Sequence, residues 1–179
     1  QNEWRGPMFD PKQLETKEGR EELSKMATQY YKTIHDAIRK FDKNHLILGD
    51  RYDINEPVAM EVIEAAKPYV DVLSFQDFQN PALNLKEWYK KTGKPVLLAD
   101  GAGITKGEGI YKRTDGAWYA EQIESLFDNP GCVGFHLCGA YQRNKARARG
   151  LLDEHEHPDV ENVEIIKNTN EKINLWMKE

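Results

Sequence analysis

Only two cysteines, Cys132 and Cys138, occur in this sequence of 179 residues. Two thiols cannot build a disulfide framework, and alone they cannot complete a four-ligand zinc site. The sequence also lacks an apolar run of the roughly 18 residues that a membrane-spanning helix needs. Basic residues are fewer than acidic ones, 25 against 30, so the net charge is −5. This balance argues against a general nucleic-acid-binding protein, which carries a concentrated basic surface.

The chain begins Gln1-Asn2-Glu3-Trp4, without an initiator methionine or a signal peptide. We interpret the sequence as a piece of a longer polypeptide. Its length suits one domain rather than two.

Short apolar runs rich in β-branched residues alternate with helical patterns along the chain. This alternation predicts βα units and a parallel sheet. The predicted strands are residues 45–49, 70–75, 95–100 and 132–137. The predicted helices lie within residues 23–41, 55–66, 85–91, 115–127 and 160–177. In the first of these helices, apolar residues recur every three or four positions and form one stripe: Leu23, Met26, Tyr30, Ile34, Ile38 and Phe41.

Long polar loops, residues 100–114 and 137–158, follow two of the predicted strands. In a (β/α)8 barrel the loops after the strands carry the chemistry. A whole barrel needs about 250 residues, so four βα units make only half of one. An isolated half would expose two sheet edges and an uncovered apolar interior. We therefore expect residues 1–179 to form a partial catalytic domain. An N-terminal half, on the same or a separate polypeptide, would complete it, and a self-paired dimer is the alternative.

Two carboxylates are candidate catalytic groups, Glu3 and Asp100. Asp100 ends the third predicted strand, and Glu3 would end a strand that precedes the first helix. Two carboxylates on opposite sides of a barrel suit glycoside hydrolysis, one as proton donor and one as nucleophile or base. The segment Asn-Glu-Pro at residues 55–57 resembles the acid/base motif that is usual in clan A glycoside hydrolases. It lies beyond the strand and begins a predicted helix, so we interpret Asn55 as an N-cap.

The order and spacing of six segments resemble clan A glycoside hydrolases, in particular the agarase-like family 50 and family 42. Asn2-Glu3 resembles the motif at the end of strand 4. Residues 45–52, 69–76 and 93–100 resemble strands 5, 6 and 7, and residues 129–136 and 150–153 resemble strand 8 and its loop. The implied fold is the C-terminal part of a (β/α)8 TIM barrel, from the end of strand 4 through helix 8.

The resemblance implies a glycosidase similar to β-agarases, which cleaves a polysaccharide or oligosaccharide by retaining double displacement and without a cofactor. In this assignment Asp100 is the nucleophile and Glu3 is the acid/base. The resemblance also implies that the protein is bacterial and is secreted or periplasmic. The residues expected to bind the sugar are Asn2, Arg51, Gln76, His136 and Tyr141.

Two positions depart from the family pattern. Asp100 stands where the family has Glu, and Leu137 stands where a Trp follows the strand-8 histidine. Loss of one methylene draws the carboxylate back by roughly 1.5 Å, one C–C bond. Retaining enzymes hold their carboxyl groups about 5–5.5 Å apart and inverting enzymes about 6.5–9.5 Å apart. Asp100 therefore attacks poorly, acts through a water molecule, or marks an inactive relative, unless the backbone shifts to compensate.

Two other functions stay open at this point. One is a noncatalytic sugar-binding or scaffolding protein, which Asp100 and Leu137 favour. The other is an enzyme similar to metal-dependent sugar isomerases, because carboxylates and one histidine at strand ends can bind Mg²⁺ or Mn²⁺. Its candidate ligands are Glu3, Asp50, Asp100 and His136.

Aromatic and basic residues near the strand ends give weaker indications. Aromatic rings stack on sugar rings but are as often part of the core. We assign Trp88, inside a predicted helix, to packing. The basic cluster in the last long loop suits a solvated surface, or binding of sulfate or uronate groups on an acidic polysaccharide. The aromatic candidates are Trp4, Tyr52, Phe78, Tyr111 and Tyr141, and the basic ones are Arg143, Lys145, Arg147 and Arg149.

Overall fold

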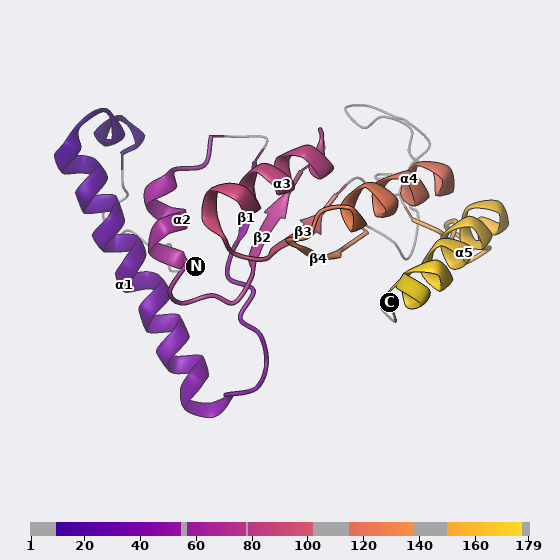
Figure 1. Ribbon diagram of the computed structural model, residues 1–179, viewed down its shortest axis with the longest axis horizontal. Helices are drawn as coiled ribbons and strands as arrows, with labels where there is room; N and C mark the ends of the chain where they lie inside the picture. Colours follow the sequence, from indigo (N-terminus) through magenta and orange to yellow (C-terminus); the bar gives the residue numbers. More distant parts are fainter. Residues whose placement is uncertain (1–9, 55–56, 78, 102–114, 138–149, 177–179) are drawn as a thin grey trace. The chain divides into compact units, whose positions relative to one another are not determined.

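The computed structural model describes residues 10–54, 57–77, 79–101, 115–137 and 150–176 (Figure 1). The described residues fall into two compact units. The helical unit comprises the residues up to Gly49 together with Pro57–Val72. The sheet unit comprises residues 50–54 and the residues from Leu73 onward. None of the described helices is both long and apolar enough to cross a membrane.

The helical unit contains the 3-10 helix η1 (Pro11–Glu15) and the helices α1 (Lys17–Phe41) and α2 (Met60–Ala66). Thr16 caps α1, because its hydroxyl accepts a hydrogen bond from the amide of Gly19 at 3.1 Å. Helix α1 packs against α2, where Ala27 and Ile63 are buried. An ion pair of 2.8 Å joins Arg20 to Glu61 across the two helices.

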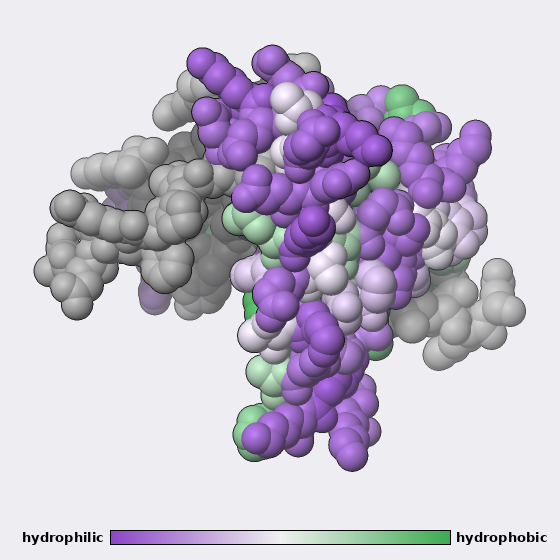
Figure 2. All heavy atoms as spheres, turned by 90° about the vertical axis from the view of Figure 1, so that its left-hand side faces the viewer, coloured by the Kyte–Doolittle hydropathy of each residue, from purple (hydrophilic) through white to green (hydrophobic). Residues whose placement is uncertain are grey.

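The apolar stripe predicted on the first helix is exposed in the structure. The helix itself is confirmed, but its buried side chains are Ala27 and Tyr31, each one position after a residue of the stripe. White and green groups accordingly interrupt the hydrophilic surface over α1 in Figure 2. The exposed members of the stripe are Met26, Tyr30, Ile34, Ile38 and Phe41.

The sheet unit contains four parallel strands, which lie in the order β1-β2-β3-β4. This arrangement confirms the predicted parallel sheet of βα units, and closure into a barrel stays a prediction. The strands are β1 (Arg51–Asp53), β2 (Leu73–Gln76), β3 (Val96–Asp100) and β4 (Cys132–Phe135). The helices are α3 (Pro81–Thr92), α4 (Gly116–Phe127) and α5 (Val160–Trp176), which lie close to the predicted positions.

The first predicted strand, residues 45–49, is wrong, since the strand begins at Arg51. In this segment the backbone of Ile47 forms hydrogen bonds with both the side chain and the amide of Asp71. Its Oδ2 atom accepts a hydrogen bond from the Ile47 amide at 2.7 Å, while its own amide donates to the Ile47 carbonyl at 2.8 Å. Gly49 then adopts a φ of 67°, which interrupts the extended backbone.

The predicted start of the second helix is also wrong. Helix α2 begins at Met60 with Ala59 as its N-cap residue, so Asn55 does not cap it. Pro57 precedes the helix and is not part of its first turn. Asn55 and Glu56 themselves lie outside the described residues.

The core of the sheet unit lies between the sheet and α3. Phe75 is fully buried and stacks on Trp88, with ring centroids 5.2 Å apart. Trp88 is therefore a packing residue, as predicted. Tyr52 is buried and its ring centroid lies 5.7 Å from that of Phe75, so it belongs to this core and is not a sugar-stacking platform.

A second apolar cluster joins α4 to α5. Tyr119, Ile123 and Ile166 are buried in it, and Leu137 packs against them. Leu137 is thus part of the packing beside β4.

Candidate active site

The candidate site lies at the carboxyl ends of the parallel strands, as the sequence predicts. Asp53 of β1 pairs with Gln76 of β2, and Gln76 pairs with Asp100 of β3. Arg51 lies two residues before Asp53 and pairs with Ser74. The register of the sheet therefore places polar side chains from three adjacent strands in one row.

The central contact of the site joins Arg51 to Asp100. Nη1 of Arg51 lies 2.8 Å from Oδ2 of Asp100, and β2 lies between the two strands that carry them. The carboxylate is 12% exposed and the guanidinium side chain 53% exposed. A charge-assisted hydrogen bond of this length fixes the orientation of the carboxylate. Two residues that the sequence predicts as site residues are thus brought together.

The second carboxylate oxygen of Asp100, Oδ1, does not have such a hydrogen bond to any described residue. Oδ1 is buried and has no hydrogen-bond partner within the described parts of the chain. A buried acceptor without a partner is energetically unfavourable, typically by about 1–3 kcal/mol. Such groups are uncommon in proteins and often have a functional reason. The carboxylate of Asp100 therefore has one oxygen held by Arg51 and one buried oxygen without a hydrogen-bond partner among the described residues.

Gln76 forms a separate contact in the same row. Its Nε2 atom donates to Oδ2 of Asp53 at 3.0 Å, and this hydrogen bond links β2 to β1. The structure thus places Gln76 at the predicted edge, with Asp53 as its partner. Asp53 was not among the predicted site residues, although its position two residues after Arg51 on one strand put it on the same face.

A buried aspartate that sequence reasoning missed, Asp77, follows directly after β2. Only 1% of the residue is exposed. Its carboxylate accepts hydrogen bonds from the amide of Gln79 at 2.7 Å and from Nδ2 of Asn84 at 2.7 Å. Its amide donates to the carbonyl of Asp100 at 3.0 Å. The signal that indicates such a residue is an aspartate a few positions before a helix that starts with proline.

His136 follows β4, with an exposed side chain. Its amide donates to the Leu98 carbonyl at 2.8 Å and so continues the pairing of β3 and β4. The remaining predicted site residues, Asn2, Glu3 and Tyr141, lie outside the described residues. The basic cluster and Cys138 also lie outside them, and so do all the predicted aromatic candidates other than Tyr52. Within the described ranges, no group of three or more His, Cys, Asp or Glu residues could hold a metal ion.

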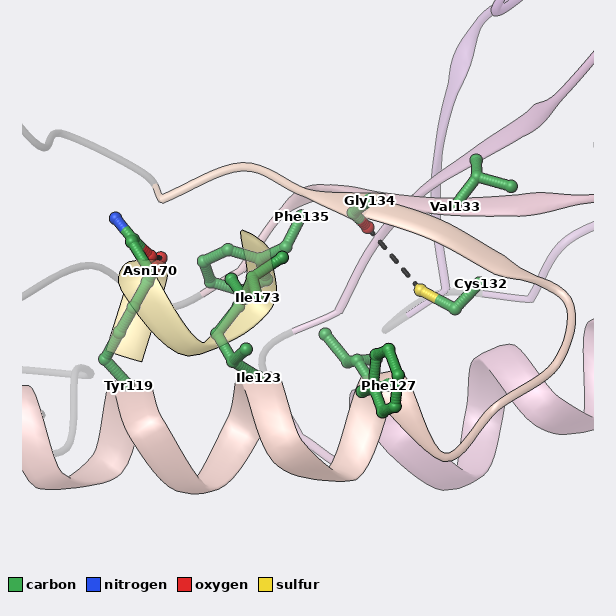
Figure 3. Close-up of a pocket in the computed structure, with 10 residues that line it drawn as sticks. Tyr119, Ile123, Phe127, Cys132, Val133, Gly134, Phe135, Asn170 and Ile173 are labelled. Carbon is green, nitrogen blue, oxygen red and sulfur yellow. Dashed lines mark hydrogen bonds between the residues drawn. The ribbon is translucent and has the colours of Figure 1, made fainter. Parts of the chain in front are cut away.

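An apolar pocket of about 620 Å³ lies away from this row, between α4, β4 and α5 (Figure 3). Burial raises the pKa of the Cys132 thiol, whose Sγ lies 3.5 Å from the Gly134 carbonyl. Burial also raises the pKa of Tyr119, whose hydroxyl donates to Asn170 at 2.7 Å. Both groups are therefore uncharged at neutral pH, and the pocket suits packing rather than acid–base chemistry. Its lining residues are Tyr119, Ile123, Leu126, Phe127, Cys132, Val133, Gly134, Phe135, Asn170 and Ile173.

Comparison with known proteins finds similarity to β-agarases. The solved structure of an exo-β-agarase is 27% identical in sequence and superposes with a TM-score of 0.73 over 87% of this chain. The curated β-agarase B of Vibrio sp. (strain JT0107) is 25% identical over 127 residues, 65% of this chain. This chain is similar to part of the β-agarases.

The fold of this chain also matches PfGH50B, with 23% identity and a TM-score of 0.74 over 87% of the chain. The predicted similarity to agarases is thus confirmed, while the resemblance to family 42 and to the clan A barrel stays a prediction. No family model matches the chain. The chain spans only 23% of the length of the exo-β-agarase, 24% of PfGH50B and 13% of β-agarase B.

Proposed function

We propose that this chain is the C-terminal part of a (β/α)8 glycoside hydrolase that cleaves a polysaccharide, similar to β-agarases. The observation that carries the proposal is the carboxylate of Asp100 at the end of β3, held by Arg51 in a chain that is 27% identical to an exo-β-agarase. In parallel α/β folds the carboxyl ends of the strands are where ligands bind and react.

The proposed mechanism is a retaining double displacement. Oδ1 of Asp100, the oxygen that Arg51 does not bind, attacks the anomeric carbon of the sugar while Glu3 protonates the departing glycosidic oxygen. Glu3 then takes a proton from water, the water oxygen attacks the anomeric carbon, and the bond to Asp100 breaks. Arg51 supports the first step because it fixes the carboxylate and leaves one oxygen for the attack. Residues Asn2, Gln76, His136 and Tyr141 complete the proposed sugar site.

The proposal includes a partner that supplies the remaining strands of the barrel. Three observations support it. The relatives are several times longer than this chain. The apolar side chains of Met26, Ile34 and Ile38 are exposed on α1, where a partner would cover them. Val133, on the edge strand β4, is also exposed.

The reaction is tested by reducing-sugar release from agarose, porphyran and other galactans with the complete enzyme. Asp100→Asn and Glu3→Gln are expected to lose at least about 1,000-fold in kcat on substrates with poor leaving groups, because each removes a group that acts in the transition state. Asp128→Asn, a matched change at the C-terminal end of α4, should keep full activity. If either site variant retains full activity, its assignment fails.

A noncatalytic sugar-binding protein is the second candidate, favoured by Asp100 in place of the family's glutamate. Isothermal titration with agaro-oligosaccharides distinguishes the two. Binding without turnover by the parent protein would support this candidate, and turnover that Asp100→Asn abolishes would exclude it. The change Asp100→Glu adds the missing methylene, so a gain of activity from an inactive parent would locate the defect at this side chain.

The partner is tested by light scattering and by mass spectrometry of the native species. If the proposal is right, the native species is heavier than this chain, because it also contains the N-terminal half of the barrel. A folded, soluble monomer of 20.7 kDa without a second chain would contradict it.

A further inference from the structure

Strand β3 carries one residue more than β2 where both strands approach their carboxyl ends. Phe75 pairs with Leu98, but the next residue of β2, Gln76, pairs with Asp100. Ala99 is therefore the extra residue of a β-bulge. Because side chains alternate between the faces of a sheet, one extra residue moves the following side chain to the other face.

The faces of the sheet are defined by the pairs on either side of the bulge. Arg51 pairs with Ser74 and Asp53 pairs with Gln76, so these four side chains share one face, which we call the polar face. Phe75 points to the opposite face, where it stacks on Trp88.

Without the bulge, Asp100 would lie on the apolar face, two residues after Leu98, which pairs with Phe75. With the bulge, Asp100 pairs with Gln76 and its carboxylate meets Arg51 at 2.8 Å on the polar face. The bulge thus determines on which face of the sheet Asp100 lies.

Asp77 holds the bulged end of β3 in place. Its amide donates to the carbonyl of Asp100 at 3.0 Å, directly beyond the bulge. Its buried carboxylate is anchored at the start of α3 by the amides of Gln79 and Asn80, at 2.7 and 3.2 Å, and by Nδ2 of Asn84 at 2.7 Å. Asn80, the N-cap residue of α3, makes no capping hydrogen bond with its side chain. Asp77 instead accepts from the amides of Gln79 and Asn80, the two residues directly before α3, and its negative charge is favourable at a helix N-terminus.

We propose that Asp77 is a positioning residue for Asp100. Its carboxylate fixes the loop after β2 to α3, and its amide holds the bulge that keeps Asp100 on the polar face beside Arg51. This inference rests on the proposed function, in which Asp100 is the nucleophile.

The first test separates positioning from stability by kinetics on the complete enzyme. Asp77→Asn puts an amide NH₂ group against Nδ2 of Asn84, so two donors face each other. The expected result is a loss of about 10- to 100-fold in kcat, with KM changed less than about 2-fold, because a displaced nucleophile affects the reaction more than binding.

Two further variants complete the kinetic test. The double variant Asp77→Asn/Asn84→Asp restores one donor and one acceptor and should recover kcat to within about 3-fold of the parent. Asp115→Asn is the matched control, because Asp115 is also an aspartate at the N-terminus of a helix, α4, where it accepts from the Trp118 amide at 3.0 Å. Asparagine keeps this acceptor and removes only the negative charge, so the variant should leave kcat unchanged. If Asp77→Asn lowers kcat no more than Asp115→Asn does, the proposal is wrong.

The second test does not depend on activity. Crystal structures of the parent and of Asp77→Ala, or of Asp77→Asn if the alanine variant does not fold, give the distance from Arg51 Nη1 to Asp100 Oδ2. An increase from 2.8 Å to beyond 4 Å, the limit of an ion pair, supports the proposal. An unchanged distance and an unchanged bulge overturn it. If the parent enzyme hydrolyses no galactan, the proposed function fails, and this structural measurement alone decides the role of Asp77.

Discussion

Truncation of Phe75 is expected to destabilise the sheet unit more than most single substitutions do. The side chain is 0% exposed, stacks on Trp88 at 5.2 Å and contacts Tyr52. Replacement of a buried Phe by Ala costs about 3–5 kcal/mol, of which the aromatic pair accounts for about 0.5–1.5 kcal/mol. We expect Phe75→Ala to lower the free energy of unfolding by about 4 kcal/mol, a large part of the roughly 5–15 kcal/mol that stabilises a typical domain.

The assay is urea unfolding followed by tryptophan fluorescence, which gives the free energy of unfolding and its dependence on urea. Phe75→Leu keeps most of the buried volume and should cost less than about 1.5 kcal/mol. Phe41→Ala makes the same chemical change at a residue that is 85% exposed, and should cost less than about 0.5 kcal/mol. A loss below about 1.5 kcal/mol for Phe75→Ala, with an unchanged urea dependence, would refute the reasoning.

Three further predictions concern single groups. Cys132 should react with iodoacetamide at pH 8 at least about 10-fold more slowly than free cysteine, because burial raises the pKa of its thiol, and peptide mass spectrometry measures the rate. Equal rates would contradict this. The amide of His45 donates to Asp42 and lowers the pKa of Asp42 from 3.8 to about 2. The ionised carboxylate of Asp42 therefore contributes its full stabilisation above pH 3.8, and this stabilisation is lost as the pH falls through 2. A titration of the Asp42 carboxyl by NMR with a midpoint near 3.8 would show that the contact is absent. Gly131→Ala should cost about 1–3 kcal/mol in urea unfolding, since its new Cβ would lie 2.1 Å from the Tyr89 ring, and a variant as stable as the parent would contradict this packing.

The regular elements of the fold could largely be predicted from the sequence. Alternating β-branched runs and helical patterns gave α1, α3, α4 and α5, together with β2, β3 and β4. Two details could not be predicted from the periodic pattern. The Asp71 carboxylate binds the Ile47 amide, so the segment before Arg51 is not a strand. Helix α2 starts at Met60, with no side-chain cap that the sequence could signal.

The candidate site was predictable in part. Arg51 and Asp100 were expected at the same edge because parallel strands end there together, and the structure joins them at 2.8 Å. The face that Asp100 occupies could not be predicted, because it depends on one extra residue in the pairing of β2 with β3. The position of Asp77 shortly before Pro81 was a usable signal, but its individual contacts come from a loop whose geometry no periodic pattern encodes.

The order of the strands has a consequence for how this sheet forms during synthesis. Each strand pairs with the strand that precedes it in the chain, and the paired residues are near in sequence: Arg51 with Ser74, Leu73 with Val96, and Val96 with Cys132. Short separations keep the entropy cost of closing each connection small. A nascent chain that leaves the ribosome can therefore extend the sheet by one βα unit at a time, because each new strand finds its neighbour already synthesised. Pairing of β1 with β2 does not have to wait for α5, the last of the described helices to be made.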